Sequence, residues 1–165
     1  MFNILHLIMI EQIYTYFTIE TTYLWINLGV MPFWVILIFF PQSNFCKIFT
    51  TSIFPLFVFS VIYLCLFYKI FKNDYNFLNN FNLYFSLNEL KNLLYENNFL
   101  ILFWIHFLAI NLFCGGWIVK DSQKFAINKI LIFFPLLITY LIGPIGLFIY
   151  WLIRIFYAKK ISLYE

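Results

Sequence analysis

Three polar side chains beside or within an apolar stretch are the residues best suited to chemistry. His106 and Asn111 lie inside the uncharged run 99–119, and Asp121 follows the end of that run. A neutral imidazole carries one hydrogen-bond donor and one acceptor, so His106 can exchange a proton, bind a pigment or join two helices as a strut. Asp121 can act as an acid or base, or as a solvated cap on the next turn. The sequence leaves these interpretations open.

The spacing of these residues separates them on a helix. His106 and Asn111 are five positions apart, which corresponds to about 140° around an α-helix, so they do not share a face. Asn111 instead lies on one face with three other residues of the run, namely Trp104, Leu108 and Gly115. Such a stripe, ending in glycine, is typical of a contact surface between membrane helices. Gly115 and Gly116 would also admit the close approach of a backbone or a flat ligand.

The usual enzyme and metal signatures do not occur. The chain has no G-x-S-x-G, no phosphate-binding glycine loop and no paired histidines at metal spacing. Its three cysteines, Cys46, Cys65 and Cys114, are at unrelated spacings, so neither a disulfide framework nor a zinc site is predicted. We therefore expect no metal and no cofactor. The net charge of +3 is small and its basic residues form no stripe, which gives no support to nucleic-acid binding.

The elements that position these residues are membrane helices. Of the 165 residues, 64% are apolar and 10% charged, with a mean hydropathy of +0.90. A backbone in hydrocarbon must satisfy its own hydrogen bonds, and nothing in the chain alternates like barrel strands. We predict an all-α fold, an integral membrane bundle of four transmembrane helices. The four spans are 23–40, 49–71, 99–119 and 130–157.

Local signals refine this plan. Pro41 ends the first span, and the capping box that begins at Ser86 predicts a short amphipathic surface helix between the second and third spans. The fourth span contains Pro135 and the sequence GPIG at 143–146, which predict a kink or break near mid-membrane. We divide the chain into an N-terminal segment 1–20, which an interfacial helix or an over-called start codon would each explain, the transmembrane domain 21–158 and a tail 159–165.

The basic residues give an orientation. Four spans would place both termini and the loop 73–98 on one side, which then holds six basic residues against four on the other. The excess predicts both termini in the cytoplasm. No transit peptide is recognised, which favours a bacterial inner membrane over a plastid. The oligomeric state does not follow from the sequence.

The last third of the chain resembles a known family. The strings WIHFLAINLFCGGWIVKDSQ from Trp104 and FPLLITYLIGPIGLFIYWLIR, which ends at Arg154, resemble the ABSCISIC ACID DEFICIENT 4-like family of small membrane proteins. The matching residues are His106, Leu108, Ala109, Leu112, Phe113, Gly115, Trp117, Asp121, Pro135, Thr139, Gly143, Pro144, Gly146, Leu147 and Arg154. Earlier residues match less specifically, through Asn27, Trp34, Pro41, Phe85 and Ser86. The resemblance covers 23–154.

The resemblance implies a function. Plant members are required to make neoxanthin from violaxanthin, an isomerisation that opens an epoxide and creates an allene. It thereby implies a carotenoid or other isoprenoid as ligand in a lipid bilayer, with His106 and Asp121 as candidate catalytic residues. The candidate substrate-binding residues are Asn27, Trp34, Trp104, Asn111, Gly115, Trp117 and Thr139. The alternative is a non-enzymatic protein that binds a carotenoid or isoprenoid, or organises a partner membrane protein.

Two departures from the family pattern bear on that function. Asn111 stands where the pattern has Asp, and Gly116 stands where it often has Arg. The joint loss of two opposite charges is consistent with a lost intramembrane ion pair, since either charge alone would be costly there. The change at Asn111 also removes a candidate acid or base, which argues against the plant reaction itself.

Overall fold

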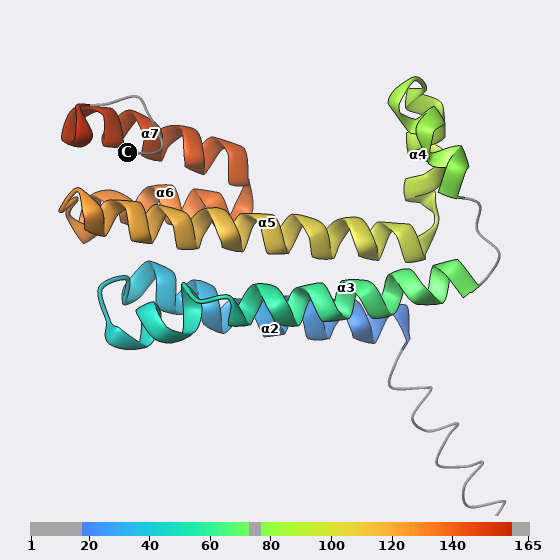
Figure 1. The fold of residues 1–165 in the computed structure, drawn as a ribbon, viewed down its shortest axis with the longest axis horizontal. Coiled ribbons are helices and arrows are strands. Elements are labelled where there is room, and N and C mark those ends of the chain that lie inside the picture. Colours follow the sequence, from blue (N-terminus) through green and yellow to red (C-terminus); the bar gives the residue numbers. More distant parts are fainter. Residues whose placement is uncertain (1–17, 73–76, 160–165) are drawn as a thin grey trace, which may run out of the picture.

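The computed structural model describes residues 18–72 and 77–159, whose regular structure is helical (Figure 1). Three helices are long and apolar enough to cross a membrane: α2 (Ile19–Phe39), α3 (Phe54–Lys72), which the π-helical turn η1 (Cys46–Thr50) precedes, and α5 (Asn97–Lys124). The remaining elements are the 3₁₀ helix η2 (Phe77–Tyr84), α4 (Leu87–Tyr95), α6 (Lys129–Leu141) and α7 (Gly143–Ala158). The predicted interfacial segment lies almost wholly in 1–17, outside the described ranges.

Local sequence signals set several of these helix ends. The Thr18 side chain caps α2 by accepting a hydrogen bond from the Thr21 backbone N–H at 3.2 Å. α2 ends at Phe39, just before Pro41, as the sequence predicts. The Ser86 hydroxyl accepts from the Glu89 N–H at 3.4 Å, which confirms the predicted start of the short surface helix α4.

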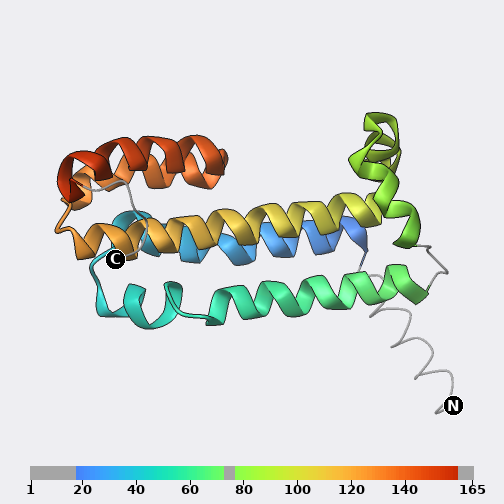
Figure 2. The ribbon, with the colours of Figure 1, turned by 45° about the horizontal axis from the view of Figure 1, so that its top comes forward.

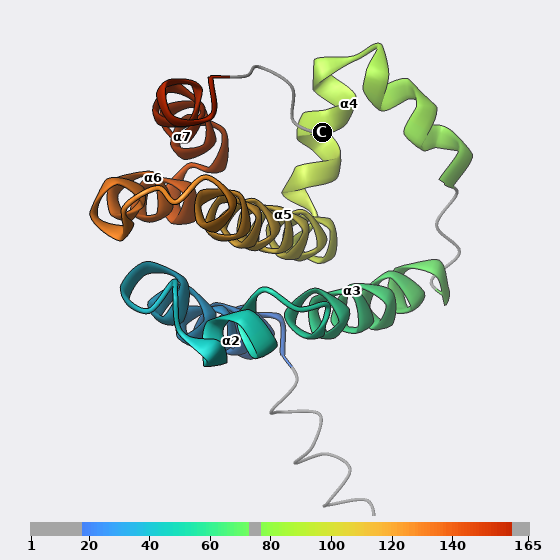
Figure 3. The same cartoon turned by 60° about the vertical axis from the view of Figure 1, so that its left-hand side comes forward.

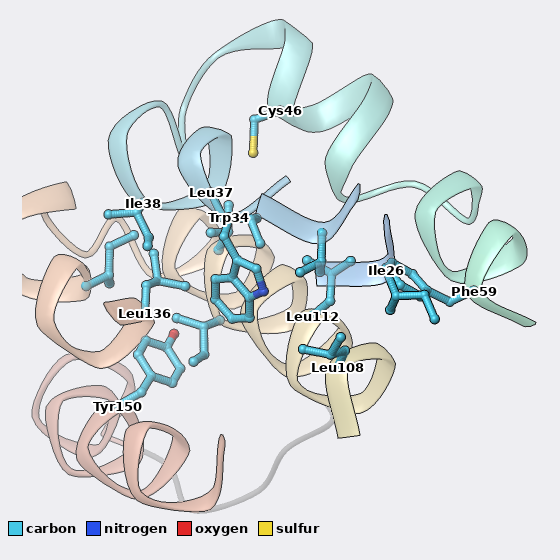
Figure 4. Packing of buried hydrophobic residues seen from close by; sticks show 14 of the residues in the cluster. Ile26, Trp34, Leu37, Ile38, Cys46, Phe59, Leu108, Leu112, Leu136 and Tyr150 are labelled. Atoms are coloured by element: carbon cyan, nitrogen blue, oxygen red, sulfur yellow. The ribbon is translucent and has the colours of Figure 1, made fainter. Parts of the chain in front are cut away.

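The central element is α5, which contacts α2 and α3 on one side and α6 and α7 on the other (Figure 3). Its apolar residues join a core that extends through all the long helices. Trp34 of α2 lies in that core together with Leu37, Leu112 and Leu136 (Figure 4). Buried aromatic area of this kind dominates packing, so the core fixes how the helices sit around α5.

The predicted fourth span is two helices instead of one. At 1.5 Å per residue, α6 and α7 are about 20 and 24 Å long, shorter than the roughly 30 Å of a hydrocarbon core. Pro144 has no N–H to continue the ladder of α6, and its ring disfavours helical geometry in the residue before it. It stands instead in the first turn of α7, where a missing N–H costs little. The predicted break is confirmed, and it divides the expected fourth span 130–157 into two helices, each shorter than a complete crossing.

The two short helices form a hairpin against half of α5. Gly143, the first residue of α7, lies against Asn111 near the middle of α5, whereas Arg154 in its last turns reaches Asp121 near the end of α5. Asn111 and Asp121 are separated by a rise of about 15 Å along the helix. The hairpin therefore enters about halfway and returns to the side from which it began (Figures 1 and 2).

This hairpin bears on the predicted orientation. Ile19 at the start of α2 lies beside Lys69 and Asn98, whereas α7 ends at the opposite end of the bundle. The two ends of the described chain, residues 18 and 159, therefore lie at opposite ends of the bundle, whereas the prediction of both termini on one side assumed four complete crossings. If only the three long helices cross, we expect these two ends on opposite sides of the membrane.

Candidate functional site

The face of α5 that meets α3 is hollowed by a cavity of about 560 Å³. Its wall is apolar apart from three side chains, which are Ser60 and Tyr63 of α3 and His106 of α5. His106 is exposed and makes no hydrogen bond or ion pair with any residue of the described ranges. Its imidazole is therefore available to a ligand in this cavity.

A second cavity of about 440 Å³ continues toward the end of α5. It shares Leu56 and Phe113 with the first, so the two form one groove, which we call the α3–α5 groove. The wall of the second cavity is also mostly apolar, and it includes Thr50, Thr51, Ser52, Gly116, Trp117 and Lys120. From His106 to Lys120 the groove follows α5 for about 21 Å, at 1.5 Å per residue.

The face of α5 that meets α7 is closed by a buried polar cluster. The Arg154 Nε and the Tyr150 hydroxyl both donate to the Asp121 Oδ2 at 2.7 Å. The Arg154 guanidinium also lies 4.9 Å from the centre of the Phe125 ring, and Trp117 meets Tyr150 edge to face at 5.6 Å. We call Asp121, Tyr150 and Arg154 the Asp121 cluster. Asp121 is only 8% exposed, so its interpretation as a solvated cap is wrong.

The structure does not bring the two candidate catalytic residues together. His106 lines the α3–α5 groove, whereas Asp121 binds α7 on another face of the same helix. The 15 residues between them correspond to a rise of about 22 Å. A proton relay that uses both side chains on one small group is therefore excluded, and the two residues belong to different parts of the molecule.

Several candidate substrate-binding residues make contacts between helices. The Trp104 Nε1 donates to the Asn27 Oδ1 at 3.2 Å, which links α5 to α2. A Cβ on Gly115 would lie 2.8 Å from the Trp34 ring, so only glycine admits that ring. These contacts confirm the predicted contact surface on α5.

Two further candidates, Asn111 and Thr139, lie at the α6–α7 hairpin. The Thr139 hydroxyl donates to the Pro135 carbonyl at 2.7 Å, and a Cβ on Gly146 would collide with Thr139. Asn111 is 4% exposed, and its amide leaves no room for a Cβ on Gly143. Asn111 and Gly116 thus have different neighbours, so the structure gives no support to an ion pair between these two positions.

The structure adds residues that sequence reasoning missed. Ser60, Tyr63 and Thr50 line the groove, and no spacing pattern distinguishes them within apolar runs. Arg154 was named from the sequence only as a residue that matches the family pattern, and Tyr150 was not named. The two are four residues apart, so they share a helix face. In the described ranges, three buried polar atoms lack a hydrogen-bond partner, namely the Trp34 Nε1, the Thr50 Oγ1 and the Asn111 Nδ2.

The described chain is a small all-α protein with candidate membrane spans. Its main features are three long apolar helices, the α6–α7 hairpin and the α3–α5 groove. Comparison with protein families matches residues 21–150 to the ABA DEFICIENT 4-like family. The chain therefore belongs to that family, which confirms the resemblance seen in the sequence. Comparison with curated proteins and with solved structures gives no match.

Proposed function

We propose that this chain is an integral membrane protein that binds a carotenoid in the α3–α5 groove and isomerises it at His106. The observation that carries the proposal is the groove itself, which is long, almost wholly apolar and furnished with one exposed imidazole. An extended polyene needs such a wall, and ligand sites typically combine an apolar wall with a few polar groups. The membership of the chain in its family supports the choice of ligand.

Asn111, where the family has an acid, lies at the α6–α7 hairpin and does not line the groove, so its replacement leaves the groups of the groove unchanged. Those groups suit the opening of an epoxide. In this isomerisation the epoxide C–O bond breaks, its oxygen gains a proton, and a neighbouring polyene carbon loses one as the allene forms. One imidazole can serve as acid in the first transfer and as base in the second, so no oxidant is needed. Ser60 and Tyr63 offer hydroxyls on the opposite wall, where they can hold the oxygen. The apolar wall keeps water away from the reacting carbons.

The proposal is tested in a host that accumulates violaxanthin. The chain and its variants are expressed there, and chromatography analyses both the membrane pigments and the pigment that copurifies with the protein. We expect an allenic product with the wild-type chain, and with His106→Ala a bound pigment without product. Ala109→Phe, which fills the groove beside His106, should abolish both. Gly29→Phe on α2 is the control, because no atom lies within 4 Å of a Cβ there.

A second candidate function is binding without catalysis. It is favoured by the position of Asp121, because this candidate acid or base lies outside the groove. Binding alone predicts that the wild-type chain copurifies with unchanged violaxanthin, and that losses are graded over several aromatic positions. If neither bound pigment nor product appears, while the protein is folded, both functions are wrong.

A further inference from the structure

A polar cavity of about 660 Å³, which we call the Lys129 cavity, lies at the end of the bundle where α5 ends and α6 begins (Figure 1). Its wall comes from the turn after α2, from the start of η1 and from the stretch that joins α5 to α6. The lining residues are Gln42, Lys47, Gln123, Ala126, Ile127, Asn128 and Lys129. The Gln123 Nε2 donates to the Pro41 carbonyl at 2.7 Å, which holds the turn after α2 against the end of α5. The cavity is separate from the α3–α5 groove, because none of the described residues lines both.

The polar side chains of this cavity can donate hydrogen bonds to an anion. Lys47 and Lys129 are exposed, and neither forms an ion pair with a residue of the described ranges. The Asn128 Oδ1 accepts from the Ile130 N–H at 3.0 Å, so the two N–H groups of the Asn128 amide remain available. The amide of Gln42, which is also exposed, supplies two more donors. No acidic side chain lines the cavity in the described chain, so these donors have no carboxylate beside them.

The charge around the cavity also favours an anion. Lys129 is the first residue of α6, where the positive end of the helix dipole disfavours a cation, and the first turn of α6 contains no acidic residue. Among the described residues, this end of the bundle holds six basic residues and one carboxylate, that of Asp121, which Arg154 already binds. An anion bound beside Lys129 would offset both the charge of the lysine and the dipole of α6.

An apolar groove begins at the same lysine. Its volume is about 380 Å³, and it shares Lys129 with the Lys129 cavity. The rest of its wall is apolar and comes from α2 and α6, namely from Ile38, Phe39, Ile130, Phe133 and Phe134. The groove follows α6 away from the cavity and toward the middle of the bundle, by a rise of about 6 Å from Ile130 to Phe134. A polar cavity that continues into an apolar groove matches a molecule with an anionic head and a hydrocarbon tail.

We infer that the Lys129 cavity binds the phosphate of an anionic phospholipid, and that one acyl chain of this lipid lies in the groove between α2 and α6. A phosphate diester only accepts hydrogen bonds, which suits a cavity whose free polar groups are lysine and amide donors. Basic pockets between membrane helices bind acidic lipid head groups through the same chemistry. The inference does not depend on the proposed function, because the lipid and the carotenoid occupy different sites.

The test compares an anionic lipid with a zwitterionic one. The full-length chain is purified in a neutral detergent, and native mass spectrometry measures its affinity for phosphatidylglycerol, phosphatidylcholine and glycerol 3-phosphate. We expect the wild-type chain to bind phosphatidylglycerol about 20-fold more tightly than phosphatidylcholine, because each lysine near an anionic lipid contributes a factor of about five. Lys47→Gln and Lys129→Gln should each reduce this preference about fivefold. Lys159→Gln is the control, because it removes the same charge from an exposed position at the same end of the bundle but outside the cavity.

Three outcomes would overturn the inference. The first is equal affinity of the wild-type chain for the two lipids. The second is a loss of preference in Lys159→Gln as large as in Lys47→Gln and Lys129→Gln, which would show a general effect of net charge. The third is binding of glycerol 3-phosphate as tightly as phosphatidylglycerol, which would identify a soluble phosphate as the ligand. Each of these results leaves the α3–α5 groove and the proposed function untouched.

A photoreactive lipid locates the acyl chain. Phosphatidylglycerol with a diazirine in one acyl chain is added to phosphatidylcholine nanodiscs that contain the full-length chain, and peptide mapping identifies the residues that it labels. We expect the strongest labelling at 130–134 of α6, and we expect Lys129→Gln to reduce it and Lys159→Gln to leave it unchanged. Labelling that is spread evenly over the helices, or that Lys129→Gln does not reduce, would overturn the placement of the chain in this groove.

Discussion

The two sides of α5 are built differently. On the side of α7, a carboxylate, a guanidinium and a phenol are buried together, Gly143 lies close against the Asn111 amide, and Gly146 lies close against α6 at Thr139 and Pro135. On the side of α3, the wall is apolar and hollow, and its histidine makes no hydrogen bond within the described chain.

This difference indicates that the two faces of α5 have different roles. Buried charges and tight glycine contacts fix geometry, because each has few acceptable arrangements. An open apolar groove fixes little and can accept a long flexible ligand. We infer that the α6–α7 hairpin serves as the rigid support and that α3 forms the binding side.

The first prediction concerns which helices cross the membrane completely. If α2, α3 and α5 cross and the hairpin returns, Lys159 at the end of α7 lies on the side of Gln42, which follows α2, and opposite Asn92 of α4. Single cysteines at these positions, in a chain without native cysteines, are labelled with an impermeant maleimide in intact and permeabilised bacterial cells. In intact cells we expect Asn92→Cys to react, and Gln42→Cys and Lys159→Cys only after permeabilisation.

The orientation in that prediction follows from charge. Among the described residues, the side that holds the end of α5 has six basic residues, Lys47, Lys120, Lys124, Lys129, Arg154 and Lys159. The other side has three, Lys69, Lys72 and Lys91. Basic residues accumulate in the cytoplasm, so α7 should end there. Equal labelling of Asn92→Cys and Lys159→Cys in intact cells would restore four full spans and contradict the hairpin.

The second prediction breaks the rigid side. Arg154→Met leaves the Asp121 carboxylate buried without its cation, a change that typically costs about 3–5 kcal/mol. The free energy of unfolding is measured by detergent denaturation in mixed micelles. Lys159→Met, an exposed position near the same helix end, should change it by less than about 0.5 kcal/mol.

A double variant sharpens this result. Asp121→Asn combined with Arg154→Met removes both charges, so its loss should be smaller than that of Arg154→Met alone. A loss below about 1 kcal/mol for Arg154→Met would show that the cluster does not hold the hairpin in place.

The comparison also shows what local sequence can reveal. The helical class, the end of the first span before Pro41 and the Ser86 cap depend on composition or on neighbouring residues, and all were predictable. The break at 143–146 was predictable because glycine and proline interrupt a helix locally. The reversal of the chain at that break was not, since it depends on the packing of Gly146 against Thr139 across the turn and on the long-range contact of Arg154 with Asp121.

The candidate site was predictable only in part. His106 and Asn111 are conspicuous as polar residues in an apolar run, and their different helix faces follow from spacing. The pairing of Asp121 with Arg154 joins residues 33 positions apart. The groove depends equally on where α3 sits, so Ser60, Tyr63 and Thr50 carried no local signal. The sequence therefore indicated which side chains were candidates, whereas the partners of these side chains could be identified only from the fold.

The third prediction has the smallest effect on stability and tests the binding side. The strut hypothesis requires His106 to be hydrogen-bonded between helices, whereas in the structure it is exposed and makes no such bond within the described chain. His106→Ala should therefore change the free energy of unfolding by less than about 0.5 kcal/mol, in the same mixed-micelle assay. A loss of more than about 1 kcal/mol would instead support a strut, because a broken buried hydrogen bond costs that much. If the His106→Ala chain is stable and still binds pigment, any loss of product is a loss of catalysis. The histidine of the groove would then differ from the Asp121 cluster in role as well as in position.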